Sequence, residues 1–224
     1  VINSGCSIDM SFVDEIPGIG AILFICQLGT EGGNAFADVI SGKVTPSGKL
    51  ADTWAKKYAD IPFHDEFSYL NGNVDEEYYK EGIYVGYRYF NTFAPKAIAY
   101  PFGYGLSYTS FDFKDMEVVS VDGGWNVNVT VRNTGKVAGK DVVQIYVKAP
   151  KGDLDKPERE LKGFAKTPEL APGETCKVKV YISKGSLASY DEKAGKWVVD
   201  SGKYTFVASQ DALDSSLKVK VKVD

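Results

Sequence analysis

The chain has 224 residues, of which 44% are hydrophobic and 25% charged, and its formal net charge is −4. These are ordinary values for a globular protein of one or two domains, and the negative charge argues against nucleic acid as a partner, because phosphate binding needs a basic surface. No window of the sequence approaches 18 uninterrupted apolar residues, so we expect no membrane-spanning helix and no membrane partner.

The first 55 residues combine strand and helix patterns. The continuous apolar run AILFIC at residues 21–26 predicts a strand buried on both faces of a parallel sheet, and VINSG at residues 1–5 is typical of the end of another. A glycine-rich turn at residues 29–33 is followed by apolar residues at helical spacing over 35–40. Strand, turn and helix form an α/β unit that is too small to be stable alone. We therefore expect residues 1–55 to be a fragment of an α/β domain.

Residues 107–224 follow a period of two. Apolar and polar residues alternate over 125–131, 176–182, 204–208 and 217–223, and residues 142–147 (VVQIYV) predict a more buried strand. Turn signals separate these segments. About seven short strands in this order predict an all-β antiparallel sandwich, fibronectin type III-like or immunoglobulin-like. The lysines that alternate along the last segment predict a solvated face on an edge strand.

Neither period holds over residues 56–106. This connector contains the aromatic stretches YKEGIYVGYRY (79–89) and PFGYG (101–105). A connector of this length without regular structure is rare inside a compact domain unless it has a function. We expect its rings to supply contact area between domains, with a carbohydrate-stacking platform as the alternative.

Tyr84, Tyr87 and Arg88 are the candidate rim or interdomain residues of this linker. Aromatic residues occur at both odd and even positions along the stretch. Because alternate residues of an extended segment point to opposite sides, one buried face cannot contain all of these rings. We expect one side of the linker to pack on the sandwich and the other to face a domain outside this chain. An unpaired buried charge is strongly unfavourable, so Arg88 needs a carboxylate partner, for which Glu81 and Asp112 are the candidates.

Histidine and cysteine are scarce. His64 is the only histidine, and Cys6, Cys26 and Cys176 are scattered along the chain. This pattern predicts neither a disulfide framework nor a metal site, so we expect buried free thiols and no metal or cofactor. The low cysteine content favours a reducing, cytoplasmic compartment.

Several long motifs occur in a fixed order along the chain. They are GTEGGNAFADVISGKVTPSGKLADTW (29–54), EGIYVGYRYF (81–90), PFGYGLSYTSF (101–111) and NTGKVAGKDVVQIYV (133–147). Together they resemble glycoside hydrolase family 3, the β-glucosidase family. The resemblance implies three parts: the C-terminal part of an α/β sandwich domain (1–55), a linker (56–106) and a fibronectin type III-like domain (107–224).

The resemblance also implies a function. Family members are mostly retaining glycosidases, which use two carboxyl groups about 5–5.5 Å apart, and their nucleophile is an Asp in a Ser-Asp-Trp/Tyr-type motif on a TIM-like barrel. This chain has no such motif, so we assign it no catalytic residue and expect it to be inactive alone. The implied protein hydrolyses terminal, β-linked glycosyl residues of oligo- or aryl-glycosides, with the barrel as the partner of this chain.

Two alternatives remain open at this point. Glu31, in the GTEGG turn, is a candidate for the rim of a sugar site, and its structural alternative is a carboxylate favoured by the helix N-terminus. The whole chain is alternatively a non-catalytic carbohydrate-binding or structural module.

Overall fold

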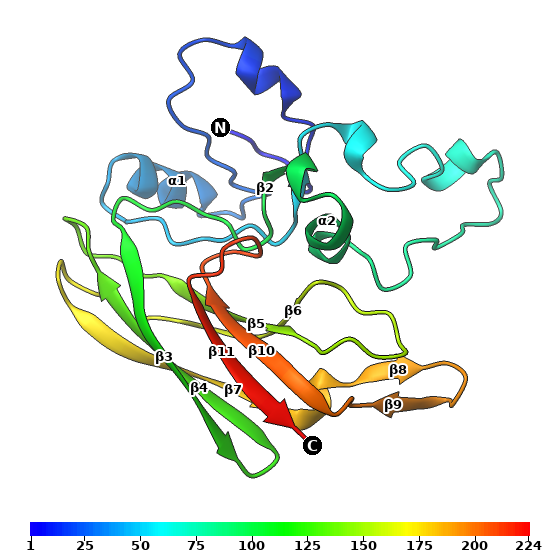
Figure 1. Ribbon diagram of the computed structural model, residues 1–224. Helices are drawn as coiled ribbons and strands as arrows, with labels where there is room; N and C mark the ends of the chain where they lie inside the picture. The colour runs from blue at the N-terminus through cyan, green and yellow to red at the C-terminus, as the bar shows by residue number, and fades with distance from the viewer.

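The computed structural model describes the backbone of residues 1–224 and all side chains except those of Asp14, Ser68 and Tyr69. Two antiparallel sheets form a sandwich in its C-terminal half, which confirms the predicted fold (Figure 1). The three-stranded sheet has the order β3 (Phe111–Val121), β4 (Gly124–Asn133), β7 (Thr175–Ser183). The four-stranded sheet has the order β11 (Leu217–Val223), β10 (Gly202–Ser209), β5 (Val142–Lys148), β6 (Glu160–Lys166).

The core lies between the two sheets and follows the predicted alternation. Val127, Val129 and Val131 of β4 are fully buried, while the residues between them are half-buried on the other side of the strand. Trp125 meets Phe206 of the opposite sheet, with ring centroids 5.6 Å apart. Inward side chains of two facing sheets thus form one apolar layer.

The four-stranded sheet is also buried on its outer face. Tyr146 of β5 is 0% exposed and Val207 of β10 is 3% exposed, and both point away from the main core. Tyr87, Phe102 and Leu161 pack against them. A strand covered on both sides is apolar at consecutive positions, which explains why residues 142–147 do not alternate.

Strand β11 is an edge strand with a lysine-rich outer side. Lys218, Lys220 and Lys222 are exposed, and β11 pairs with β10 at the edge of the four-stranded sheet. This confirms the predicted solvated face. Charged side chains on an edge strand discourage pairing with another chain.

The N-terminal segment contains helix α1 (Gly32–Ile40), as predicted. Residues 1–5 and 21–26 meet in a parallel bridge between Ile2 and Phe24, but residues 21–26 are only half-buried or exposed. The prediction of a strand buried on both faces is therefore wrong for this chain, because the described residues cover the segment only in part, for example where the Trp54 ring lies 5.0 Å from the Phe24 ring. Cys6 and Cys26 are exposed free thiols and Cys176 is half-buried and free, so burial of the thiols was also wrongly predicted.

The linker contains regular structure that its sequence did not predict. It forms helix α2 (Tyr87–Phe93) and strand β2 (Ile98–Tyr100), which pairs with β1 (Trp54–Ala55). These elements are too short to show a period in the sequence. The remaining elements are the strands β8 (Ser189–Asp191) and β9 (Lys196–Val198) and the 3-10 helices η1 (Ser11–Glu15), η2 (Tyr58–Asp60), η3 (Ser68–Asn71), η4 (Pro95–Ala97) and η5 (Lys184–Leu187).

None of the described helices is long and apolar enough to cross a membrane.

Candidate functional site

Helix α2 is the part of the linker that lies over the sandwich (Figure 1). It begins after Gly86, whose φ of 58° and ψ of −129° favour glycine. The abrupt entry turns Tyr87 and Arg88 towards the four-stranded sheet. Phe90, 3% exposed, packs instead on Ile98 of β2. Helix α2 thus starts after Gly86 and presents Tyr87 to the sandwich and Phe90 to β2.

Tyr87 is the main apolar contact of α2 with the sandwich. Its ring centroid lies 4.9 Å from that of Phe102 and 5.9 Å from that of Tyr146. Its hydroxyl oxygen accepts a hydrogen bond from the Leu161 N–H at 2.9 Å, and the Arg88 guanidinium lies 5.6 Å from its ring centroid. Burial raises the pKa of Tyr87, although the Leu161 hydrogen bond acts in the opposite direction. The prediction that one side of the linker packs on the sandwich is confirmed.

Arg88 finds its partner on β6. Its Nε donates to Oε1 of Glu160 at 3.2 Å, and Lys162 pairs with the other oxygen of Glu160 at 2.9 Å. The predicted partners, Glu81 and Asp112, are wrong, because α2 directs Arg88 towards a strand that lies 72 residues further along the chain. The two side chains are 38% and 28% exposed, so we expect this pair to contribute at most about 1 kcal/mol.

Tyr84 lies at an end of the linker that remains partly in solvent. It is half-buried, and its ring packs on Phe93 with centroids 4.7 Å apart. Burial and the negative charge of Asp155 raise its pKa. Phe93 is 57% and Val85 is 55% exposed. We call Tyr84, Val85 and Phe93 the linker patch.

Glu31 is the N-cap residue of α1, but its side chain does not cap the helix backbone. It accepts a hydrogen bond from Nδ2 of Asn34 at 2.6 Å and is exposed. Figure 1 shows α1 and α2 at separate positions above the sandwich. The structure therefore brings Tyr87 and Arg88 together and leaves Glu31 on another element.

A buried ion pair, which the sequence analysis missed, joins the PSGKL segment to the sandwich. Lys49 Nζ lies 2.9 Å from Oδ1 of Asp141, with the side chains 15% and 4% exposed. Lys49 also donates to the Gly105 carbonyl at 3.2 Å, and Gln210 donates to Oδ2 of Asp141 at 2.9 Å. The carboxylate is therefore both paired and hydrogen-bonded, as a buried charge requires.

Gln144 continues this polar contact. It comes from the apolar strand β5, and its Nε2 donates to the Gly103 carbonyl at 3.0 Å and to the Gln210 carbonyl. Its Oε1 accepts from the Tyr146 hydroxyl at 2.7 Å, and burial raises the pKa of Tyr146. A glutamine within a buried strand was the sequence signal for this site. We call the set Lys49, Gly103, Asp141, Gln144 and Gln210 the polar seam.

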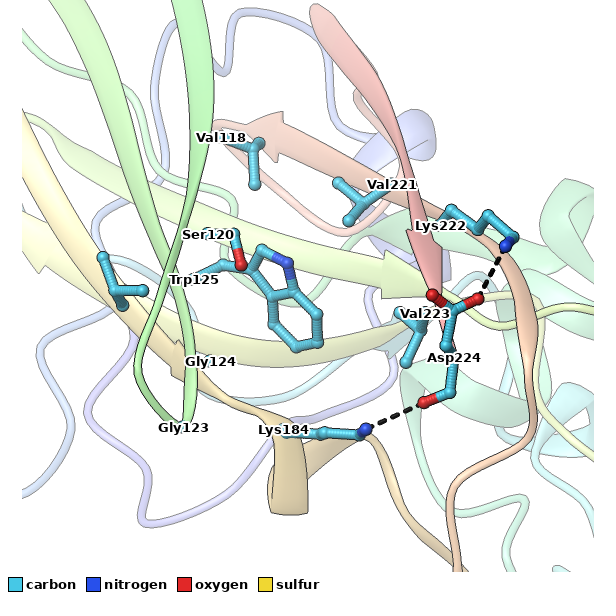
Figure 2. A pocket seen from close by; sticks show the side chains of 11 residues that line it. Val118, Ser120, Gly123, Gly124, Trp125, Lys184, Val221, Lys222, Val223 and Asp224 are labelled. Carbon is cyan, nitrogen blue, oxygen red and sulfur yellow. Dashed lines mark hydrogen bonds and ion pairs between the residues drawn. The ribbon is translucent and has the colours of Figure 1, made fainter.

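A hollow of about 370 Å³ opens at the end of the sandwich beside the β3–β4 turn (Figure 2). Trp125 and Val118 form part of its apolar lining. At its rim, Lys184 donates to the main-chain oxygen of Asp224 at 2.8 Å, and Lys222 pairs with the Asp224 carboxylate at 2.7 Å. The charged groups of the rim thus pair with one another, and none of the predicted site residues lines the hollow.

No group of three or more His, Cys, Asp or Glu side chains that could hold a metal ion occurs among the described residues.

Comparison with known proteins gives two family matches. Residues 1–87 match the glycosyl hydrolase family 3 C-terminal domain, and residues 141–212 match the fibronectin type III-like domain. A β-glucosidase of Ruminococcus albus is 42% identical over 94% of this chain, and the thermostable β-glucosidase B of Acetivibrio thermocellus is 40% identical over all of it. The chain covers 22% and 29% of these two relatives.

Solved structures agree with these matches. β-Glucosidase 3B of Thermotoga neapolitana, in complex with glycerol, is 42% identical, with a TM-score of 0.89 over 99% of this chain and 30% of that one. The β-glucosidase of Kluyveromyces marxianus, in complex with glucose, is 34% identical, with a TM-score of 0.90 over 99% of this chain and 26% of that one.

Proposed function

Because this chain belongs to the C-terminal region of glycosyl hydrolase family 3, we propose that it is the accessory part of an enzyme that hydrolyses terminal β-linked glucosyl residues with retention of configuration. One observation carries the proposal: β-glucosidases about two-fifths identical to the chain match nearly its whole length, and the chain spans only 22–29% of theirs. Identity at this level over both domains supports the same reaction class.

The proposed division of labour follows from the chemistry. Retention requires a carboxylate nucleophile and an acid/base carboxyl group about 5–5.5 Å apart. We place the nucleophile on a TIM-like barrel, which corresponds to the part of the relatives that this chain does not cover. The described residues then supply support and docking surface rather than the attacking group.

The linker patch is the proposed contact with that barrel. Tyr84 is half-buried, and Val85 and Phe93 are more than half exposed, and exposed apolar patches often mark interaction sites. Arg88 already has Glu160 as a partner, so we assign the docking contact to the apolar side chains instead. The roles of Glu31, Tyr87 and Arg88 at a substrate rim or domain boundary stay predictions.

The test compares the chain alone with the chain plus a catalytic barrel. We expect no turnover of an aryl β-glucoside by the isolated chain, and binding when the separately produced barrel of a related β-glucosidase is added. Phe93→Ser should weaken that binding about 10-fold, a loss of about 1.4 kcal/mol. Phe164→Ser, at a similarly exposed ring on the sandwich (68% exposed), is the matched control. Turnover by the isolated chain, or barrel binding that Phe93→Ser leaves unchanged, would contradict the proposal.

A further inference from the structure

The hairpin β8–β9 carries two aromatic rings in solvent. Tyr190 and Trp197 lie directly opposite each other in the hairpin, with ring centroids 5.4 Å apart and an interplanar angle of 64°. They are 49% and 70% exposed. Figure 1 shows the hairpin at the side of the sandwich, away from α1. Single exposed rings are common on protein surfaces, but a pair in contact on a projecting element has a defined geometry that a ligand can use.

The hairpin is fixed at both ends. At its base, the buried Tyr204 donates from its hydroxyl to the Asp200 carbonyl at 2.9 Å, and the Asp200 carboxylate pairs with Lys156 of the β5–β6 loop. At its tip, Oδ1 of Asp191 accepts hydrogen bonds from two backbone N–H groups of the turn, at 3.0 and 3.1 Å. An isolated two-stranded hairpin is marginally stable, so these contacts hold the rings in place before any ligand arrives.

The surroundings of the rings favour a sugar over a protein partner. Exposed charged side chains follow at the turn, namely Glu192, Lys193 and Lys196. The surface offered by two aromatic rings with a charged border is much smaller than the surface that a stable protein interface buries. A pyranose ring, by contrast, presents C–H groups that pack on one aromatic face and hydroxyl groups that hydrogen-bond to polar side chains around it.

We propose that Tyr190 and Trp197 form a sugar-binding platform on the fibronectin type III-like domain, with a chain of β-linked glucose units as its ligand. The choice of a β-linked glucose chain rests on the proposed function. The more exposed Trp197 provides the stacking face, and Tyr190 supports it from the opposite strand. Glu192 and Lys196 are the nearest polar groups in sequence for the sugar hydroxyls.

The experiment titrates the 224-residue chain with cellopentaose and follows binding by ¹⁵N NMR shifts. Shifts should concentrate on residues 189–198, and Trp197→Ala should weaken binding about 10-fold, which corresponds to about 1.4 kcal/mol. Tyr190→Ala should weaken it less, and Trp197→Phe should keep part of the affinity because a flat ring remains. Phe164→Ala removes an equally exposed ring elsewhere on the sandwich (68% exposed) and should leave binding unchanged.

Absence of shifts on the hairpin, or equal affinity of Trp197→Ala and the parent chain, would overturn the platform. Equal binding of maltopentaose would overturn its preference for β-linked chains. Hydrolysis of an aryl β-glucoside by the full-length enzyme reports on the proposed function separately, because that small substrate does not need the platform. A platform that fails while hydrolysis proceeds therefore leaves the glycosidase proposal intact.

Discussion

Individual glycines determine how closely the linker approaches the sandwich. Gly103 has a φ of 79°, and a side chain there would overlap the amide of Gln144. A side chain at Gly105 would overlap the backbone oxygen of Gly48. Both glycines belong to the aromatic PFGYG stretch of the linker. Because Gly103 has no side chain, the Gln144 amide can reach the Gly103 carbonyl.

Gly103→Ala should lower the free energy of unfolding by about 2–5 kcal/mol, since a left-handed conformation costs an L residue about 1–2 kcal/mol and loss of the buried Gln144 hydrogen bonds adds about 1–3 kcal/mol. Urea denaturation measures the change. Gly72→Ala is the matched control, because Gly72 has a φ of 81° but a Cβ there meets no described atom within 4 Å. Equal losses in the two variants would show that the contact with Gln144 is unimportant.

Asp141→Ala should destabilise the chain by about 3–5 kcal/mol, because it leaves the Lys49 ammonium buried without its partner. The exposed pair Lys43–Asp38, with side chains 72% and 36% exposed, provides the comparison. Asp38→Ala should change the free energy of unfolding by less than about 1 kcal/mol. Thermal and urea unfolding of both variants test this difference, and a small loss for Asp141→Ala would mean that water reaches Lys49.

Elements with a clear period and the continuous apolar run of β5 were predictable from the sequence, whereas α2 and β6 were not. Strands β4, β7 and β11 were located to within two residues at each end, because apolar residues on their core face alternate with polar residues on the other face. Strand β10 was located equally well, although its outer face is also covered at Val207. Strand β6 has no fully buried residue, and α2 is only seven residues long. Neither leaves a period that a sequence pattern can show.

The candidate residues show the same limit. The spacing of the rings in the linker stretch predicted that some of them pack on the sandwich, and the packing of Tyr87 on Tyr146 confirms this. The partner of Arg88 could not be predicted, since Glu160 approaches only after β6 has paired with β5 and α2 has docked. The polar seam was missed for the same reason: its members come from four distant segments.

The linker covers the outer face of β5 and β10, so its removal should cost stability without destroying the sandwich. We expect residues 107–224 to unfold cooperatively, since the main core lies entirely within them. Their denaturation midpoint should be lower than that of residues 43–224, because Tyr146 and Val207 lose the cover of Tyr87 and Phe102. The absence of a cooperative transition in 107–224, or identical midpoints, would contradict this view.

The molecule as a whole is asymmetric in how well it buries apolar residues. Most large apolar side chains that remain exposed lie in residues 1–108, among them Tyr79, Val74 and Leu106 at 90%, 85% and 75%. The sandwich, by contrast, contains one continuous core. We therefore expect the two halves to differ in local stability.

Amide hydrogen exchange should be much faster at residues 23–25 than at residues 143–147 of the isolated chain. The first segment has one parallel bridge and is half-buried, whereas β5 lies between two strands and is covered on both faces. Local opening needs less free energy where few apolar contacts are lost. Exchange measured by mass spectrometry in the same sample gives the comparison, and equally slow exchange in both segments would refute it.

The polar seam also bears on how such proteins can be recombined. Gly103 is matched to Gln144, and Lys49 is matched to Asp141. A chimera of two relatives with its crossover at residue 107 would combine a linker from one parent with a strand from the other and separate both pairs. A crossover before residue 43 would transfer both pairs together. The unit that can be exchanged between relatives is therefore longer than the β-sandwich, and it includes the segment that begins with the PSGKL motif.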